Sequence, residues 1–173
     1  LALLILILIA YANTLFSPFN FDDQAFLMDV GSGSYPIWPA LHYRHLIYFS
    51  FSFNQMLSGL NTFSFHLTNI LFHFLSSVAV LLIVFKTNDH KTQWKGKKAL
   101  GLAITTAFLF ALNPLHTEAV TYISGLPSSM SAFFYLLALL FFILGSERKR
   151  RTLITNLFYL LSFLALSCAL ISK

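Results

Sequence analysis

Charged residues are scarce in this sequence. Only 10% of its 173 residues are Asp, Glu, Lys or Arg, whereas 57% are hydrophobic and the mean hydropathy is +0.74. Soluble domains carry about 25% charged residues. A single soluble core of this size could not hide so much apolar surface, so the composition argues against a soluble domain and predicts a polytopic membrane protein.

Cysteine and the glycine-rich motifs of soluble enzymes are also lacking. Cys168 is the single cysteine, which excludes an internal disulfide and a metal site built from several cysteines. The sequence contains no P-loop, no dinucleotide-binding glycine fingerprint and no nucleophile elbow. Cys168 lies in an apolar run and is interpreted as a packing residue.

The two ends of the chain look incomplete. It begins LALLILILIAYA, without a Met or a basic segment, which is not a complete signal peptide and is typical of the middle of a transmembrane helix. It stops at CALISK. We therefore expect residues 1–173 to be the amino-terminal part of one transmembrane domain, a fragment that lacks both ends.

Apolar runs predict about five membrane spans, since roughly 20 apolar residues cross a bilayer. The runs are Leu1–Phe16, Thr62–Phe85, Ala99–Leu112, Ser128–Leu144 and Leu153–Ile171. A further apolar stretch, Leu41–Leu57, contains polar residues including Arg44, and we expect it to lie on the outer membrane surface as an interfacial helix. The expected fold class is all-α, a polytopic helical membrane protein.

The basic residues predict how the chain is oriented. Nine of the eleven Lys and Arg lie in two short segments, Lys86–Lys98 and Arg148–Arg151. The positive-inside rule places both segments in the cytoplasm. Residues 17–61 and 113–127 then lie outside, together with Asp22, Asp23, Asp29 and Glu118. Orientation and membrane lipids with anionic headgroups account for the net charge of +5, so no nucleic-acid partner is expected.

Asp22 and Asp23 follow the first apolar run, in FSPFNFDDQAF. Carboxylates beside a bilayer are costly unless they are hydrated, paired or metal-bound. Adjacent side chains in a helix or turn point in different directions, so one aspartate can face a pocket while the other makes a structural contact. One could serve as a general base. Alternatively, Asp22 caps a short helix that starts near Asp23. The local sequence leaves both interpretations open.

The segment NPLHTEAVTYISG, Asn113–Gly125, also has two interpretations. Pro114 can end the third span and Thr117 can cap a following helix, with His116 and Glu118 as interfacial polar groups. Alternatively, both lie beside the aspartates as metal ligands or in a donor site. The His-x-Glu spacing does not put both side chains on one helical face, so it is a weak metal signal.

A polar stripe follows helical spacing in the second span. Its members are Thr62, His66, Asn69, His73 and Ser76. Such a stripe should face the interior of the helix bundle, where interhelical hydrogen bonding is its expected role.

Several of these segments, in this order, resemble the amino-terminal membrane region of GT-C type glycosyltransferases, and in particular O-mannosyltransferase-like proteins with tetratricopeptide repeats. The segments are FNFDDQAFL, YRHLIYFSFSFNQMLSGLNTFSFHLTNILFH, NPLHTEAVTYISG, SSMSAFFYLLALLFF and LISK. HLTNILFH and HTEAVTYISG together are fairly specific, and the resemblance covers nearly the whole chain.

The resemblance implies a glycosyltransferase that uses a polyprenyl-phosphate sugar, with mannose as the expected sugar, and a protein or glycan hydroxyl as acceptor. It places the reaction on the non-cytoplasmic face of a bacterial inner membrane or the endoplasmic reticulum. Asp22 or Asp23 would act as the base, with Asp22 favoured, and Arg44, His116 and Glu118 would line the site. Many such enzymes use or tolerate a divalent metal, for which Glu118 and His116 are candidate ligands.

Three positions depart from the family's pattern. Leu126 stands where an Arg is usual, Asn113 replaces a His, and His45 replaces a Pro. These differences keep open the alternative of a non-catalytic membrane scaffold or a transporter. A transporter should show paired broken helices near the midplane of the membrane, and FALNP is the one segment that indicates a break.

Overall fold

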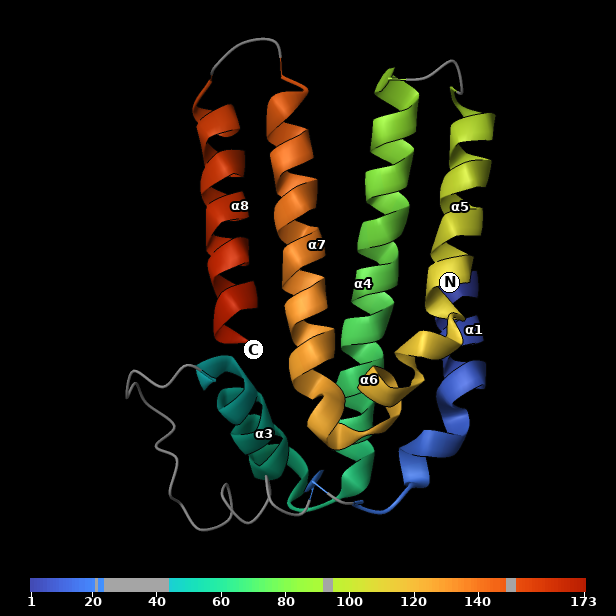
Figure 1. Cartoon of the computed structure of the whole chain (residues 1–173), viewed down its shortest axis with the longest axis vertical. Coiled ribbons are helices and arrows are strands. Elements are labelled where there is room, and N and C mark those ends of the chain that lie inside the picture. Colours follow the sequence, from blue (N-terminus) through green and yellow to red (C-terminus); the bar gives the residue numbers. More distant parts are fainter. Residues whose placement is uncertain (21, 24–43, 92–94, 149–151) are drawn as a thin grey trace.

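The chain is an all-α bundle in the computed structural model, which describes residues 1–20, 22–23, 44–91, 95–148 and 152–173 (Figure 1). The α-helices are α1 (Ala2–Tyr11), α3 (His45–Ser58), α4 (Thr62–Lys91), α5 (Lys97–Ala111), α6 (Thr117–Thr121), α7 (Leu126–Ser146) and α8 (Leu153–Ile171). Three short 3-10 helices connect them: η1 (Ala12–Phe16), η2 (Pro114–His116) and η3 (Ile123–Gly125). The predicted fold class is confirmed.

Three helical segments are long and apolar enough to cross a membrane: Thr62–Asn88, Ile123–Ser146 and Leu153–Ile171. A fourth crossing is formed if α5 and the segment Pro114–Thr121 count as one span, which is bent by 47°. Ala2–Phe16 is apolar but shorter. The chain is therefore a multi-pass membrane protein. Of the five predicted runs, the second, fourth and fifth lie in the three long segments and the third lies in the bent one, whereas the first, Leu1–Phe16, is shorter than a full span.

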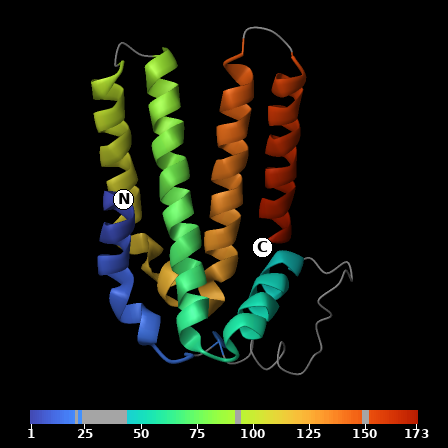
Figure 2. The same cartoon turned by 180° about the vertical axis from the view of Figure 1, so that it is seen from behind.

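Helix α4 occupies the centre of the bundle. It packs against α5 on one side and α7 on the other, and α8 packs against α7 (Figure 1). Helix α1 contacts α4 and α5 on the face that is turned away in Figure 1 and faces the reader in Figure 2. Because α4 contacts most other elements, its buried side chains can reach segments that are far apart in the sequence.

The two ends of the bundle differ in charge. At one end α4 and α7 finish and α5 and α8 begin, and we call this the basic end because it carries Lys86, Lys97, Lys98 and Arg148. At the opposite end, the acidic end, lie Asp22, Asp23, Glu118, α3 and α6 (Figure 1). The predicted placement of both basic segments on one side is confirmed for their described residues, whereas Asp29 and residues 149–151 lie outside the described part.

Small side chains let α5 approach α4 closely. Every fourth residue of the inner face of α5 is a fully buried alanine: Ala99, Ala103, Ala107 and Ala111. Small residues at this spacing are typical of tightly packed membrane helices. The outer face of α5 carries exposed apolar side chains such as Leu109, which suits contact with lipid.

Two apolar clusters anchor the acidic end. The first joins α3, α4 and the start of α7 through Ile47, Phe51, Phe65, Ile123, Leu126 and Met130. The second joins α1, α4, α5 and α6 through Ile7, Tyr11, Ile70, Ala111 and Val120. Leu126, where the family usually has an Arg, is thus a core residue that is 1% exposed.

Helix α3 matches the predicted interfacial helix in part. It begins at His45 rather than at Leu41, and residues 41–43 lie outside the described part. One face buries Ile47 and Phe51, whereas Phe49 and Met56 are exposed on the other. Gly59 ends the helix with φ of 62°, a conformation that glycine adopts without a steric penalty, and this allows the turn into α4.

Candidate functional site at the acidic end

A cavity of about 530 Å³, the outer cavity, opens at the acidic end. Its polar lining comes from four separate segments of the chain and comprises Asp22, Arg44, Glu118, Tyr122, Ser124, Ser128 and Lys173. Three residues singled out from the sequence, Asp22, Arg44 and Glu118, therefore meet here. Two carboxylates and two cations share one cavity, a combination suited to proton transfer and to the binding of an anionic group.

Arg44 is tied to the end of α8. Its Nε donates a hydrogen bond to the main-chain carbonyl of Lys173 at 3.2 Å, across 129 positions of sequence. Lys173 lines the same cavity. The sequence pattern contained this lysine within LISK, but nothing local assigned it to a site.

The adjacent aspartates have different environments. Asp22 is exposed and lines the outer cavity. Asp23 is 1% exposed, and its two carboxylate oxygens accept hydrogen bonds from different backbone segments. Oδ2 accepts from the N–H of Asn20 at 3.1 Å, and Oδ1 accepts from the N–H of Ser124 at 2.7 Å. Asp23 therefore joins two loops, while Asp22 is available to a ligand.

The loop between α5 and α7, the second loop (Asn113–Gly125), folds as a chain of short helices. Asn113 begins it by accepting a hydrogen bond from the N–H of Leu115 at 3.1 Å, with Pro114 at the first helical position. One interpretation predicted Thr117 as the cap of the following helix, but Thr117 is the first residue of α6, whose N-cap residue His116 makes no side-chain capping hydrogen bond. The asparagine that replaces the family's usual histidine has a structural role here.

Gly125 closes the second loop through a close backbone approach. A Cβ atom at this position would lie 2.8 Å from the carbonyl oxygen of Ala119 and 2.9 Å from that of Glu118. Only glycine fits without a shift of the backbone. This contact folds the loop back on itself and brings Glu118 to the cavity that Ser124 also lines.

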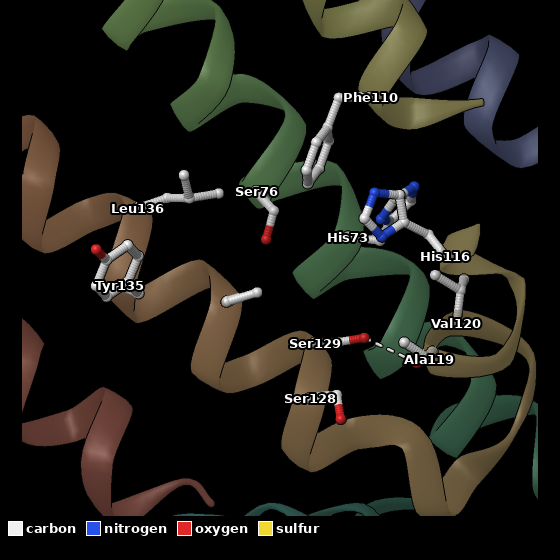
Figure 3. A pocket seen from close by; sticks show the side chains of 11 residues that line it. His73, Ser76, Phe110, His116, Ala119, Val120, Ser128, Ser129, Tyr135 and Leu136 are labelled. Carbon is white, nitrogen blue, oxygen red and sulfur yellow. Dashed lines mark hydrogen bonds between the residues drawn. The ribbon is translucent and has the colours of Figure 1, made fainter. Parts of the chain in front are cut away.

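His116 lines a second cavity of about 380 Å³, which Glu118 does not line (Figure 3). This inner cavity lies between α4, α5, α6 and α7, and its lining includes His73, Ser76, Phe110, His116, Ser129 and Tyr135. The ring centroid of His116 is 4.6 Å from that of Phe110 and 5.6 Å from that of His73. Ala119 and Ser128 line both cavities, so the two are neighbours.

The cavities separate the two candidate metal ligands. Among the described residues, no group of three or more His, Cys, Asp and Glu is arranged to hold a metal ion. Glu118 lines the outer cavity, whereas His116 lines the inner one. The divalent metal stays a prediction from the resemblance.

The polar stripe of α4 faces the bundle interior, as predicted. His66 Nε2 lies 3.2 Å from the carbonyl oxygen of Ser17, and His73 Nε2 lies 3.0 Å from that of Ala111. Asn69 Nδ2 donates to the carbonyl oxygens of Tyr122 and Val120. The expectation of hydrogen bonds to other elements is confirmed for these three residues. Ser76 instead bonds the carbonyl of Phe72 in its own helix.

The chain is similar to a set of protein O-mannosyl-transferases. It is 36% identical over 136 residues to protein O-mannosyl-transferase TMTC1 of Homo sapiens, an alignment that covers 76% of this chain and 14% of that protein. It is 31% identical over 149 residues to human TMTC3, covering 75% of this chain and 15% of TMTC3. It is 29% identical over 185 residues to human TMTC2, covering 94% of this chain and 21% of TMTC2.

The chain thus spans between 14% and 21% of the length of these relatives. No protein-family model matches it, and no solved structure is similar enough to count as a match.

Proposed function

We propose that this chain, which is O-mannosyl-transferase-like in sequence, forms part of a membrane glycosyltransferase. In this proposal the whole protein moves mannose from a polyprenyl-phosphate donor to a hydroxyl group of a protein or glycan. The observation that carries the proposal is the convergence of Asp22, Arg44 and Glu118 on one cavity at the acidic end. The relatives to which the chain is similar are named protein O-mannosyl-transferases, and this name is the basis for the class of reaction that we propose.

In the proposed step, the Asp22 carboxylate accepts the proton of the acceptor hydroxyl. The acceptor oxygen then forms a bond to the anomeric carbon, and the bond between that carbon and the phosphate oxygen breaks. The electron pair leaves with the polyprenyl phosphate. This is a single displacement with inversion, which needs one base and explains why one exposed aspartate is enough.

Arg44 and Lys173 are proposed to offset the negative charge on the leaving phosphate. Both line the outer cavity with Asp22, and guanidinium and ammonium groups are common partners of phosphate oxygens. Glu118 is proposed to accept hydrogen bonds from hydroxyl groups of the sugar or the acceptor. No part of the step is assigned to the divalent metal that the resemblance predicts, because the described residues contain no group of three or more His, Cys, Asp and Glu arranged to hold one.

The basic end is proposed to face the cytoplasm, because Lys86, Lys97, Lys98 and Arg148 lie there and the positive-inside rule applies to short loops. The outer cavity then opens on the non-cytoplasmic face of the endoplasmic reticulum or a bacterial inner membrane.

The chain bends by 47° between α5 and the segment Pro114–Thr121, next to His73, whose Nε2 lies 3.0 Å from the carbonyl oxygen of Ala111 near the middle of the α4 segment Thr62–Asn88. A transporter is expected to have paired broken helices near the midplane, whereas the described residues contain one such bend, so we keep the transferase as the first candidate.

The test is mannosyl transfer by the full-length protein, reconstituted in liposomes with a polyprenyl-phosphate mannose donor. Asp22→Asn should lower kcat by about 100-fold or more, because it removes the base, while the amount of folded protein is unchanged. Glu147→Gln, which removes an acid at the basic end, is the matched control and should transfer at the wild-type rate. Wild-type transfer by Asp22→Asn would show that Asp22 is not the base.

A further inference from the structure

We propose that His66 and Asn69 of α4, together with Asp23, are positioning residues that hold Asp22 and Glu118 on the same cavity. The inference concerns the first loop, of which residues 17–20 and 22–23 are described, and the second loop. Its catalytic consequence rests on the proposed function, whereas the positioning itself is a statement about geometry.

His66 holds the beginning of the first loop. The residue is 1% exposed, and its Nε2 lies 3.2 Å from the carbonyl oxygen of Ser17. A carbonyl oxygen can only accept a hydrogen bond, so Nε2 carries the proton and donates it. The contact spans 49 positions of sequence, which means that α4 sets where the chain leaves η1.

Asn69 holds the middle of the second loop. It is fully buried, and its Nδ2 donates to the carbonyl oxygens of Tyr122 and Val120, the latter at 3.4 Å. The two carbonyl partners determine which way the side-chain amide of Asn69 is turned, because the carbonyl oxygens would repel the amide oxygen if it took the place of Nδ2. Asn69 lies three residues after His66 on α4, so one face of one helix reaches both loops.

Asp23 closes the connection between the loops. Its carboxylate accepts from Asn20 in the first loop and from Ser124 in the second, at 3.1 and 2.7 Å. The three buried residues therefore link both loops to α4 and to each other. Asp22 is adjacent to Asp23, and Glu118 lies two positions before Val120. A change of loop register would consequently displace both cavity carboxylates.

A purely structural role would require only that the hydrogen bonds stabilise the fold. Positioning requires in addition that the bonds determine where Asp22 and Glu118 lie. Ser77 provides the matched control, because it is fully buried on the same helix but bonds only the carbonyl of His73 within α4, at 2.9 Å. Loss of the Ser77 hydroxyl removes a buried hydrogen bond without releasing a loop.

The geometric test is chemical cross-linking in the full-length protein. Cysteines replace Asp22 and Glu118 in a background that has no other cysteine, including Cys168→Ser, and a short bifunctional maleimide joins them. The cross-linking rate should fall about tenfold in His66→Leu and Asn69→Leu, because a displacement of about 1 Å has effects of this order or larger on reactions between positioned groups. Ser77→Ala should keep the starting rate.

His66→Gln provides a rescue. The side-chain amide nitrogen of glutamine can reach the place of Nε2, whereas that of asparagine stays near the place of Nδ1. His66→Gln should therefore retain fast cross-linking, and His66→Asn should lose it. This pair keeps the test decisive if His66→Leu fails to fold, since both replacements are polar amides of similar character.

In the proteins with Asp22 and Glu118 intact, the same variants should lower kcat for mannosyl transfer roughly 10–100-fold while the KM for the donor changes little. Equal cross-linking rates in His66→Gln, His66→Asn and Asn69→Leu would overturn the positioning role. If the wild-type protein transfers no mannose but the cross-linking rates follow the expected order, the proposed function fails and the positioning role stands.

Discussion

Helices α4 and α8 have nearly the same apolar character but very different roles. The most apolar 18-residue stretches of the two helices have mean hydropathies of 2.2 and 2.0, yet 33% of the residues in the first stretch and 17% of those in the second are buried within the protein. Helix α4 buries a row of polar residues: His66, Asn69, His73, Ser76 and Ser77. Helix α8 buries chiefly Thr155, Ala165 and Ala169, and presents Leu157, Phe163 and Leu170 outward.

The difference shows that the hydropathy of a membrane helix does not determine how much of the helix is buried within the protein or which segments it binds. Apolar length decides that both helices can cross a bilayer. The polar row decides that α4 binds the loops of the acidic end, because a buried polar group needs a hydrogen-bond partner. Two side-chain hydrogen bonds between described residues join α8 to α7: Ser162 donates to the carbonyl oxygen of Ala138, and Ser131 of α7 donates to that of Ala169.

The largest expected effect on stability comes from Asn69→Leu on α4. The change leaves the buried carbonyl oxygen of Val120 without the amide donor, whereas that of Tyr122 keeps a hydrogen bond from the N–H of Gly125 at 3.0 Å. A buried group that loses its partner costs about 1–3 kcal/mol. We expect the free energy of unfolding to fall by about 3 kcal/mol, measured by denaturation in mixed micelles. Asn156→Leu, at an exposed position of α8, should stay within about 0.5 kcal/mol of the wild type. Equal losses of stability in the two variants would show that the buried polar row of α4 stabilises the protein no more than an exposed position of α8 does.

Gly125→Ala tests the second loop, which Asn69 of α4 holds. The added Cβ would meet the carbonyl oxygens of Ala119 and Glu118 at 2.8 and 2.9 Å, and overpacking of this kind costs about 2 kcal/mol. Gly101→Ala on α5 is the control, because no atom lies within 4 Å of the new Cβ. It should raise the free energy of unfolding by up to about 1 kcal/mol, since alanine favours a helix more than glycine does. Thermal melting of both variants in detergent measures the difference, and a stable Gly125→Ala protein would contradict the tight turn.

Ser162→Ala on α8 should have the smallest effect. It removes the hydrogen bond of 2.8 Å to the carbonyl oxygen of Ala138, and such bonds between membrane helices average about 0.6 kcal/mol. Ser167→Ala, whose hydroxyl bonds only the carbonyl of Phe163 in its own helix, should change the free energy of unfolding even less. A loss above about 2 kcal/mol for Ser162→Ala would mean that α8 depends on polar contacts as much as α4 does.

Much of the acidic end could be predicted from the sequence because its signals are local. The spacing of His66, Asn69 and His73 indicated an inward face, and Pro114 marked the break after α5. The position of Asn54 could not be predicted in this way. It lies in α3 among polar and aromatic residues, and only the fold shows that it is buried and bonds Thr68 of α4 at 3.0 Å.

By itself, the sequence determined the helical class, the crossings and the charge difference between the two ends, since apolar length and clusters of lysine and arginine are properties of continuous segments. Tertiary structure alone decided which aspartate faces the cavity, that Glu118 and His116 line different cavities, and that Arg44 meets Lys173. The reason is distance along the chain. The contact that turns Asp23 inward is with Ser124, 101 positions away, and no local pattern encodes the register of two loops so far apart.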